Sequence, residues 1–334
     1  MQSEHRIWFV TGGNGFIGTH LIQDLVARGI EVRALARSDR SAATITELGA
    51  TPIRGELDRP ADWASQLDDV STFVHLAAAH PPEWRRKVYR RTNEEALRVV
   101  VEECVPRDIR FIHISSEAAV MDGTPMVDVD ESRPLAIGAK ALYPASKAAG
   151  EVIVTEACRR GLNGIILRPR FVWGPGDHSL EAVVASIDAG KFKMLGDGKQ
   201  LTSTTHIDNL LHAIHLAESA GERGEAYFVA DEGTIEFGAM AGAMAGALNR
   251  ELPTDSVSFG AAQTLAKVVE AVWRLPFTSG PPLTLSMVWL LGLTVTVDTT
   301  KAARDLGYQP ATSRAAGLEA LRACYSSTDR TDSL

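Results

Sequence analysis

The most constraining feature of this sequence is a glycine-rich turn between a short apolar run and an amphipathic segment. The apolar run covers residues 7–11, the turn reads TGGNGFIG, and residues 16–28 have the pattern of a helix. Glycines at this spacing let the backbone turn tightly, approach a pyrophosphate and pack a helix onto a strand. Amides at the start of such a helix point at phosphate oxygens. The pattern predicts a dinucleotide site that includes Gly12, Gly15, Phe16, Ile17 and Gly18.

The first half of the chain alternates short apolar runs with amphipathic stretches. Strands are predicted at 7–11, 31–36, 51–54, 72–76, 110–115 and 164–168, and long helices at 84–104 and 144–160. Parallel strands joined by helices form a doubly wound sheet. The sequence therefore predicts an α/β protein whose residues 1–170 form a dinucleotide-binding Rossmann core.

After residue 170 glycine and proline become more frequent, and the predicted helices at 179–190, 206–219 and 235–249 accompany a strand at 226–230. We expect residues 171–330 to form mainly a smaller substrate-binding lobe, with some segments returning to the core. Bulky side chains of this half could line an apolar pocket or fill the lobe's interior. They are Phe171, Trp173, Trp273, Phe277, Met287 and Trp289.

Composition excludes several kinds of partner. The 334 residues carry a formal charge of −8 and no run of Lys and Arg, which argues against nucleic acid. Three widely spaced cysteines without C-x-x-C spacing indicate no metal site, no disulfide framework and a reducing compartment. The uncharged stretch at 275–297 contains prolines, and its apolar part is shorter than the ~20 residues of a spanning helix. We expect a cytoplasmic protein without a signal peptide or transmembrane segment.

Tyr143 and Lys147 stand four residues apart in the sequence YPASK, so a helix places both on one face. A neighbouring ammonium and the positively charged oxidised nicotinamide favour the phenolate, which lets a tyrosine act as a base near neutral pH. The same phenol can donate its proton to a carbonyl oxygen in the reductive direction. Ser115 and Ser116, at the end of the strand at 110–115, can hydrogen-bond that oxygen. These residues predict alcohol–ketone chemistry beside a nicotinamide.

The end of the strand at 31–36 bears on the choice of dinucleotide. An acidic residue there would accept hydrogen bonds from the ribose hydroxyls of NAD. This chain has Ala36 at that position and Arg37 next, and an arginine can pair with a 2′-phosphate. We expect NADP(H) to be preferred, with NAD(H) possible.

Together these motifs resemble the extended branch of the short-chain dehydrogenase/reductase family, the NAD-dependent epimerase/dehydratase family. RGEL (54–57) is similar to the family segment near the adenine, HLAA (75–78) to that beside the ribose, and LRPRFVWGPGD (167–177) to that bordering the nicotinamide. Asn93 and HIDN (206–209) also match family positions. The resemblance implies a homodimer and further cofactor contacts, from Glu56, Leu57, Leu76, Ala77, Ala78, Ser115, Tyr143, Lys147 and Pro169.

Within that branch the chain is most similar to the 3β-hydroxysteroid dehydrogenase and sterol-4-carboxylate 3-dehydrogenase group. FIHISSEAAVMDG matches the group's serine strand and implies Ser116 as the catalytic hydroxyl, whereas a shift of one residue would place Glu117 there. The resemblance implies interconversion of a secondary alcohol and a ketone on a bulky apolar substrate such as a steroid or sterol.

Three alternatives remain open. The first is reduction of long-chain 2-alkyl-3-keto acids, whose carboxylate Arg170 could meet. The second is nucleotide-sugar epimerisation or dehydration, which the lack of cations in 275–297 disfavours. The third is an NADP-sensing regulator without catalysis, which retention of Ser116, Tyr143 and Lys147 disfavours.

Overall fold

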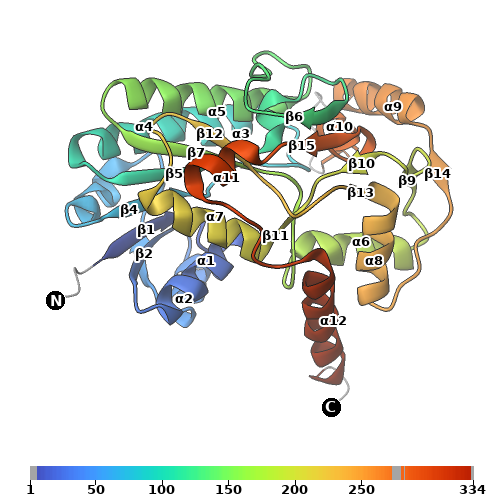
Figure 1. The fold of residues 1–334 in the computed structure, drawn as a ribbon, viewed down its shortest axis with the longest axis horizontal. Helices are drawn as coiled ribbons and strands as arrows, with labels where there is room; N and C mark the ends of the chain where they lie inside the picture. Colours follow the sequence, from blue (N-terminus) through green and yellow to red (C-terminus); the bar gives the residue numbers. More distant parts are fainter. Residues whose placement is uncertain (1–5, 273–279, 282, 332–334) are drawn as a thin grey trace.

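The computed structural model describes residues 6–272, 280–281 and 283–331. Its main body is a seven-stranded parallel sheet with the strand order β12-β7-β5-β4-β1-β2-β3 (Figure 1). The strands are β1 (Ile7–Thr11), β2 (Glu31–Ala36), β3 (Thr51–Arg54), β4 (Thr72–His75), β5 (Arg110–Ile114), β7 (Asn163–Pro169) and β12 (Ala226–Val229). The predicted α/β doubly wound fold is confirmed.

Helices cover both faces of this sheet. One face packs against α1 (Phe16–Ala27), α2 (Asp39–Glu47), α7 (Ile207–Ser219) and α11 (Thr300–Leu306), and the other against α4 (Ala96–Cys104) and α5 (Leu142–Arg159). Alternate side chains of β1 enter the two layers: Trp8 and Val10 belong to one core and Ile7 and Phe9 to the other. Strands apolar on both sides are typical of parallel sheets buried between helices.

The helix predicted at 84–104 is present but interrupted. It runs through α3 (Arg86–Tyr89), a π-helical segment (Arg90–Glu95) and α4. The π segment carries Asn93, whose amide oxygen accepts a bond of 2.7 Å from the Ala79 amide. Its amide nitrogen donates to the Ala79 carbonyl and to the Ser146 hydroxyl, each at 3.0 Å. Asn93 thereby ties the loop that follows β4 to helix α5.

The second half of the chain contributes the remaining α-helices and most of the short strands. The helices are α6 (His178–Asp188), α8 (Phe237–Ala247), α9 (Phe259–Val272), α10 (Leu285–Gly292) and α12 (Arg314–Thr331). A four-stranded sheet contains β13 (Ile235–Glu236), β10 (Leu201–Thr202), β15 (Val295–Val297) and β6 (Met126–Val129). Two smaller pairs join β8 (Val172–Trp173) to β11 (Thr205–His206), and β9 (Met194–Leu195) to β14 (Ser256–Val257). The division at residue 170 into two units stays a prediction, and α7, α11 and β12 lie in the layers of the main sheet.

Trp173 and Trp289, two of the large side chains that could have lined a pocket, instead fill the interior. Trp173 is wholly buried with Met240 and Leu321, in the contact between α8 and α12. Trp289 of α10 is also buried, in a core with Val295. Phe171 and Met287 are partly exposed, whereas Trp273 and Phe277 lie outside the described residues.

Asp231, which follows β12, is a buried carboxylate that joins several parts of the second half. It accepts hydrogen bonds from Trp173 Nε1 (2.8 Å), Thr204 Oγ1 (2.6 Å), the His206 amide (2.6 Å) and Asn209 Nδ2 (2.7 Å). Asn209 Nδ2 also donates to the Thr312 carbonyl, 2.8 Å away. The HIDN motif thus supplies two of the donors that hold β12, β8, β11 and the entry to α12 together.

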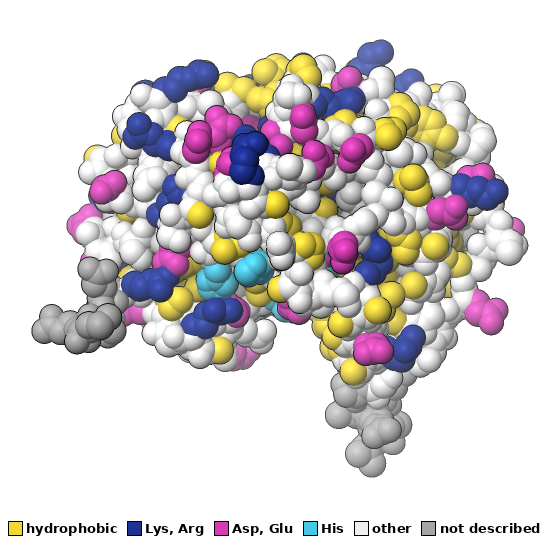
Figure 2. Space-filling model, in the orientation of Figure 1, with side chains coloured by type: hydrophobic (Ala, Val, Ile, Leu, Met, Phe, Trp, Pro, Cys, Tyr) yellow, Lys and Arg dark blue, Asp and Glu magenta, His cyan; other side chains and the backbone are white. Residues whose placement is uncertain are grey.

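Within the described ranges, no helix combines the length and the apolar character that a membrane crossing requires. Acidic and basic side chains are interspersed over the face shown in Figure 2, without a large area of one sign.

Candidate active site

The glycine turn forms a close contact between strand and helix. Gly12 has a φ of +73°, and a Cβ added there would lie 2.9 Å from the Ala77 amide nitrogen. A Cβ on Gly18 would overlap the Gly12 carbonyl oxygen. Helix α1 therefore begins directly against the turn, with its amides facing the carboxyl edge of the sheet. A turn this tight, with no room for side chains at Gly12 and Gly18, lets the backbone amides approach and bind a dinucleotide pyrophosphate.

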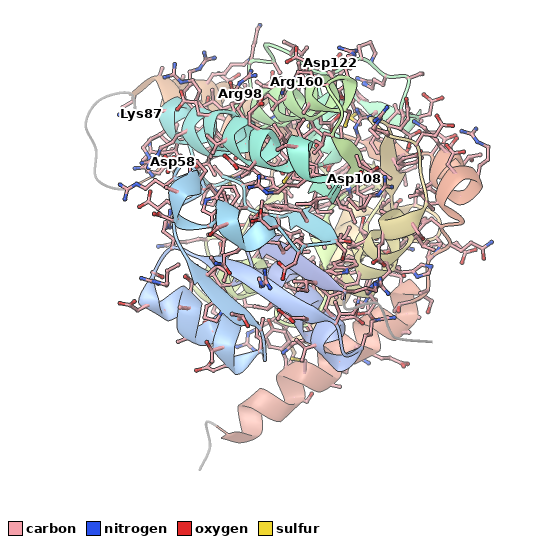
Figure 3. All side chains as sticks on the ribbon, turned by 90° about the vertical axis from the view of Figure 1, so that its left-hand side faces the viewer. Asp58, Lys87, Arg98, Asp108, Asp122 and Arg160 are labelled. Atoms are coloured by element: carbon pink, nitrogen blue, oxygen red, sulfur yellow. The ribbon has the colours of Figure 1, made fainter. Side chains whose placement is uncertain are left out.

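A cavity of about 680 Å³ opens beside this turn. Six of the predicted cofactor residues line it: Gly12, Arg37, Glu56, Leu57, Ala77 and Ala78. Lys87 and Asp58 also line it, and both lie on the side of the molecule that faces the viewer in Figure 3. Within the described residues Arg91 is paired with Glu56 and Asp58, whereas no ion pair engages Arg37 or Lys87. Two cations at the cavity are thus available to an anionic ligand.

The other predicted cofactor residues lie along the same edge. Gly15, Phe16, Ile17 and Gly18 begin α1, Leu76 follows β4, Ser115 follows β5, and Pro169 ends β7. Since the carboxyl ends of parallel strands meet at one edge, the structure brings these positions together.

Helix α5 begins at Leu142 and carries Tyr143 and Lys147 on successive turns. Lys147 is 4% exposed, and its Nζ donates to the Ile114 carbonyl at the end of β5, 3.0 Å away. Burial lowers the pKa of Lys147 to about 8, against the opposing charges of Glu151 and Glu117. The ammonium therefore loses its proton far more readily than an ordinary lysine.

The pKa of the Tyr143 phenol depends on several neighbouring groups. Burial raises its pKa above the ordinary value, and the charge of Glu117 raises it further. Hydrogen bonding with Ser116 and the charge of Arg170 act in the opposite direction but are smaller. The expected lowering of this pKa rested on the Lys147 ammonium together with the positive charge of the oxidised nicotinamide. Among the protein's own groups, burial and a nearby carboxylate prevail, so the surroundings in the fold raise the pKa of Tyr143.

The two serines that follow β5 face different partners. Ser115 Oγ donates to Glu151 Oε1 at 2.6 Å, and Glu151 also forms a buried ion pair with Arg168, Nη2 to Oε2, at 2.6 Å. Ser116 Oγ instead interacts with Tyr143 and donates to Glu117 Oε2 at 2.5 Å. Of the two hydroxyls, the structure places that of Ser116 beside the phenol, and the cofactor contact of Ser115 stays a prediction.

Comparison with known proteins agrees with this geometry. Residues 8–230 match the NAD dependent epimerase/dehydratase family. This chain belongs to that family. Among solved structures, a dTDP-glucose 4,6-dehydratase from Streptomyces venezuelae, with NAD and TYD bound, superposes with a TM-score of 0.75 at 21% identity. That likeness, which covers 97% of this chain and 98% of the other, concerns the fold alone.

Characterised relatives of this family member act on ketones and alcohols. The chain is 36% identical to a 4-hydroxy-2-methyl-3-oxo-4-farnesyl-3,4-dihydroquinoline-1-oxide ketoreductase from Stigmatella aurantiaca, over 94% of this chain and 95% of the relative. It is 30% identical to a 2-alkyl-3-oxoalkanoate reductase from Stenotrophomonas maltophilia, over 94% and 98%. A 3beta-hydroxysteroid-dehydrogenase/decarboxylase from Arabidopsis thaliana is also 30% identical, over 90% and 75%. The chain is thus an NAD(P)-dependent oxidoreductase of the extended short-chain type, which disfavours a regulator without catalysis.

A buried ion pair at this family member's site was missed by sequence reasoning. Glu117 and Arg170 are each 2% exposed, and Arg170 Nη1 lies 2.8 Å from Glu117 Oε1. Arg170 Nη2 donates to the Leu290 carbonyl of α10, 2.6 Å away. From the sequence, Arg170 was considered only as a partner for a substrate carboxylate, whereas its guanidinium is paired with Glu117 and the Leu290 carbonyl here. The one available signal was position, since the two residues follow the adjacent strands β5 and β7.

Proposed function

We propose that this protein is an NADP(H)-preferring oxidoreductase that interconverts a ketone and a secondary alcohol on a bulky apolar molecule, with Tyr143, Ser116 and Lys147 at its catalytic centre. The observation that carries the proposal is the meeting of a phenol, a serine hydroxyl and a buried lysine at the carboxyl end of β5. The ketoreductase and dehydrogenase relatives support the reaction class.

The residues present fit the cofactor for two reasons. The glycine turn has no room for a side chain at Gly12 or Gly18, so its backbone can approach a pyrophosphate, and the adjacent cavity is lined by the cations Arg37 and Lys87. When bound, the reduced nicotinamide supplies the hydride. Tyr143 donates its phenolic proton to the ketone oxygen, and Ser116 hydrogen-bonds the oxygen of the resulting alcohol. Lys147, held by the Ile114 carbonyl, would bind the nicotinamide ribose. Arg37 and Lys87 would bind a 2′-phosphate, which favours NADP(H) over NAD(H).

The walls near Tyr143 favour an apolar substrate. Helix α10, which has the sequence LSMVWLLG, packs on α5, and Ser286 Oγ accepts the Tyr143 amide at 3.2 Å. This helix carries no cation that could bind a sugar diphosphate, which disfavours the epimerase alternative. Arg170 is occupied by Glu117 and Leu290, which disfavours a keto acid held by its carboxylate. We therefore favour a sterol-like or prenylated polycyclic ketone.

The test is a parallel screen of 3-ketosteroids, prenylated polycyclic ketones, 2-alkyl-3-oxo acids and UDP-sugars with NADPH and NADH, following nicotinamide absorbance. We expect turnover of an apolar polycyclic ketone with NADPH, and a loss of at least about 100-fold in kcat for Tyr143→Phe with cofactor affinity retained.

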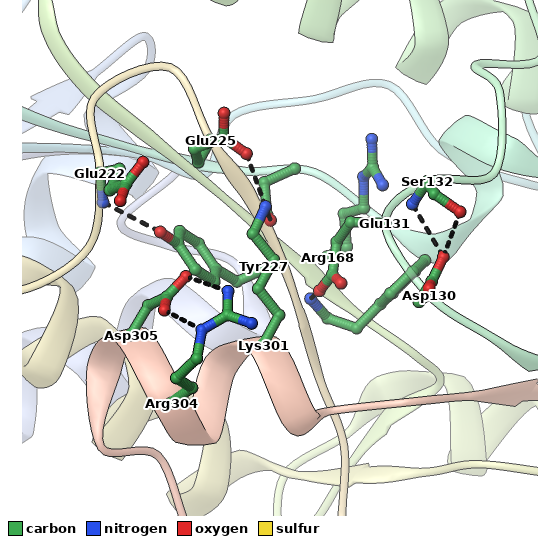
Figure 4. Close-up of polar contacts among 12 residues, drawn as sticks. Asp130, Glu131, Ser132, Arg168, Glu222, Glu225, Tyr227, Lys301, Arg304 and Asp305 are labelled. Atoms are coloured by element: carbon green, nitrogen blue, oxygen red, sulfur yellow. Dashed lines mark hydrogen bonds and ion pairs between the residues drawn. The ribbon is translucent and has the colours of Figure 1, made fainter.

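The matched control is Tyr227→Phe. The Tyr227 phenol accepts a hydrogen bond from the Glu222 amide at 2.9 Å, in a polar cluster outside the site (Figure 4). This variant should keep its activity. Turnover of UDP-sugars alone, or full activity of Tyr143→Phe, would reject the proposed function.

A further inference from the structure

The hydroxyl of Ser116 has a fixed set of neighbours. It donates its one hydrogen to Glu117 Oε2 at 2.5 Å, and it accepts the Ala118 amide at 3.2 Å. A serine hydroxyl has one hydrogen and two lone pairs, so a single lone pair remains. The short O–H to carboxylate distance is typical of a charge-assisted bond, in which the hydrogen stays with that partner. While its hydrogen is held by Glu117, Ser116 Oγ faces the reacting oxygen as a hydrogen-bond acceptor.

Glu117 in turn has little freedom to move or to be neutralised. Its second oxygen is held by Arg170 Nη1, and Arg170 is itself anchored to the Leu290 carbonyl. Both side chains are almost wholly inaccessible, so the ion pair is not exchanged for water. Removing either partner of such a buried ion pair would leave the other charge uncompensated.

The titratable and charged groups that surround the Tyr143 phenol come from four elements. Glu117 follows β5, Arg170 follows β7, Tyr89 lies on α3 with its ring centroid 6.3 Å away, and Lys147 lies one turn along α5. Helix α10 contributes no ionisable side chain. Among the described residues, Glu117 is therefore the one negative charge that acts directly on the phenol.

We propose that Glu117, anchored by Arg170, is a positioning residue that makes Ser116 a hydrogen-bond acceptor and keeps Tyr143 protonated, so that the site is prepared to reduce a ketone. In this arrangement the proton that accompanies hydride comes from Tyr143 alone: the phenolic O–H bond breaks and the O–H bond of the product alcohol forms. Ser116 then accepts a hydrogen bond from the new alcohol. The inference rests on the proposed function for the identity of the reacting oxygen.

The decisive measurement is the ionisation of Tyr143, which requires no substrate. Phenolate absorbance would be followed as a function of pH with oxidised cofactor bound. For each protein, the same titration of a version that also carries Tyr143→Phe would be subtracted, so that only the Tyr143 signal remains. We expect Glu117→Gln to move the Tyr143 midpoint down by about one pH unit or more, and Arg170→Met to move it up. At pH values below the midpoint, a decrease of one unit raises the phenolate fraction, and with it alcohol oxidation, by up to tenfold.

A matched control is Glu131→Gln. Glu131 is another partly buried acid, which accepts the Phe228 amide at 2.6 Å and does not act on Tyr143. Its substitution should leave the midpoint unchanged. If Glu117→Gln fails to fold because Arg170 is left unpaired, the double variant Glu117→Gln/Arg170→Met should still move the midpoint down, since Glu117 has the larger effect.

The outcomes separate the two proposals. An unchanged midpoint in Glu117→Gln or in the folded double variant, or a move in the same direction for Glu117→Gln and Arg170→Met, would overturn the positioning role. A shifted midpoint with no turnover of any ketone or alcohol would support this role and reject the proposed function.

Discussion

Lys147→Met should make the protein more stable near neutral pH while it removes activity. The Lys147 ammonium is buried, and its pKa is lowered from 10.5 to about 8. A difference of about 2.5 pKa units, at about 1.4 kcal/mol each, corresponds to about 3 kcal/mol by which burial disfavours the charged form. Methionine removes that penalty but also the hydrogen bond to the Ile114 carbonyl, worth about 1 kcal/mol. We expect a net gain of about 2 kcal/mol.

The pH dependence has a definite sign. Between pH 8 and 10.5 the unfolded chain holds the Lys147 proton and the folded chain does not, so folding stability rises with pH in this window. Below about pH 8 both states are protonated and the full penalty applies. The advantage of Lys147→Met should therefore be greatest at pH 6–7 and should disappear towards pH 10.

The assay is urea unfolding followed by circular dichroism at several pH values between 6 and 10, for the wild type and Lys147→Met. Because all other groups are shared, the difference between the two proteins isolates Lys147. A difference that is constant with pH, or a variant less stable than the wild type at pH 6, would refute the reasoning. Loss of activity in the same variant would confirm that the charge is needed for catalysis rather than for folding.

Three further predictions follow from single contacts. Arg37→Glu should weaken NADPH binding about 10- to 100-fold in a fluorescence titration and leave NADH binding nearly unchanged; equal losses for both would contradict the 2′-phosphate role. Gly18→Ala should abolish dinucleotide binding and lower stability by about 1–3 kcal/mol, because its Cβ overlaps the turn, whereas Gly246→Ala, with open space around it, should bind cofactor normally. Glu151→Gln should destabilise the fold by about 3–5 kcal/mol in urea unfolding, since it leaves the Arg168 charge buried and unpaired; a loss below about 1 kcal/mol would contradict this.

Much of the fold follows from local pattern. The predicted bounds of β1, β2 and β3 coincide with the structure, and for β1 and β2 this is because buried parallel strands are short apolar runs that end at glycine or polar turns. Helix α2 was not predicted, since its sequence DRSAATITE has few apolar residues and its start depends on a capping box at Ser38. Helices α9 and α10 were also missed, and for α10 the reason is that an apolar stretch without charges gives no helical periodicity to detect.

The site was predictable only in part. Tyr143, Lys147 and the glycines stand in contiguous motifs, so their placement follows from sequence spacing. The relation between Glu117 and Arg170 does not, because 53 residues separate them and only the pairing of β5 with β7 brings them together. The effect of Glu117 on the pKa of Tyr143 could not be predicted either, since burial and the position of that carboxylate depend on tertiary packing.

The carboxylate of Asp231, just after the end of β12, is connected through Asn209 to the segment that leads into α12. Asn209 bonds both this carboxylate and the Thr312 carbonyl, just before the helix that projects from the body in Figure 1. Removing the chain beyond residue 311 would leave the Asn209 side chain without that acceptor and would uncover Trp173, which lies under Leu321. A truncation about 80 residues downstream of Asp231 would thus weaken the hydrogen bonding and packing around that carboxylate, which follows strand β12.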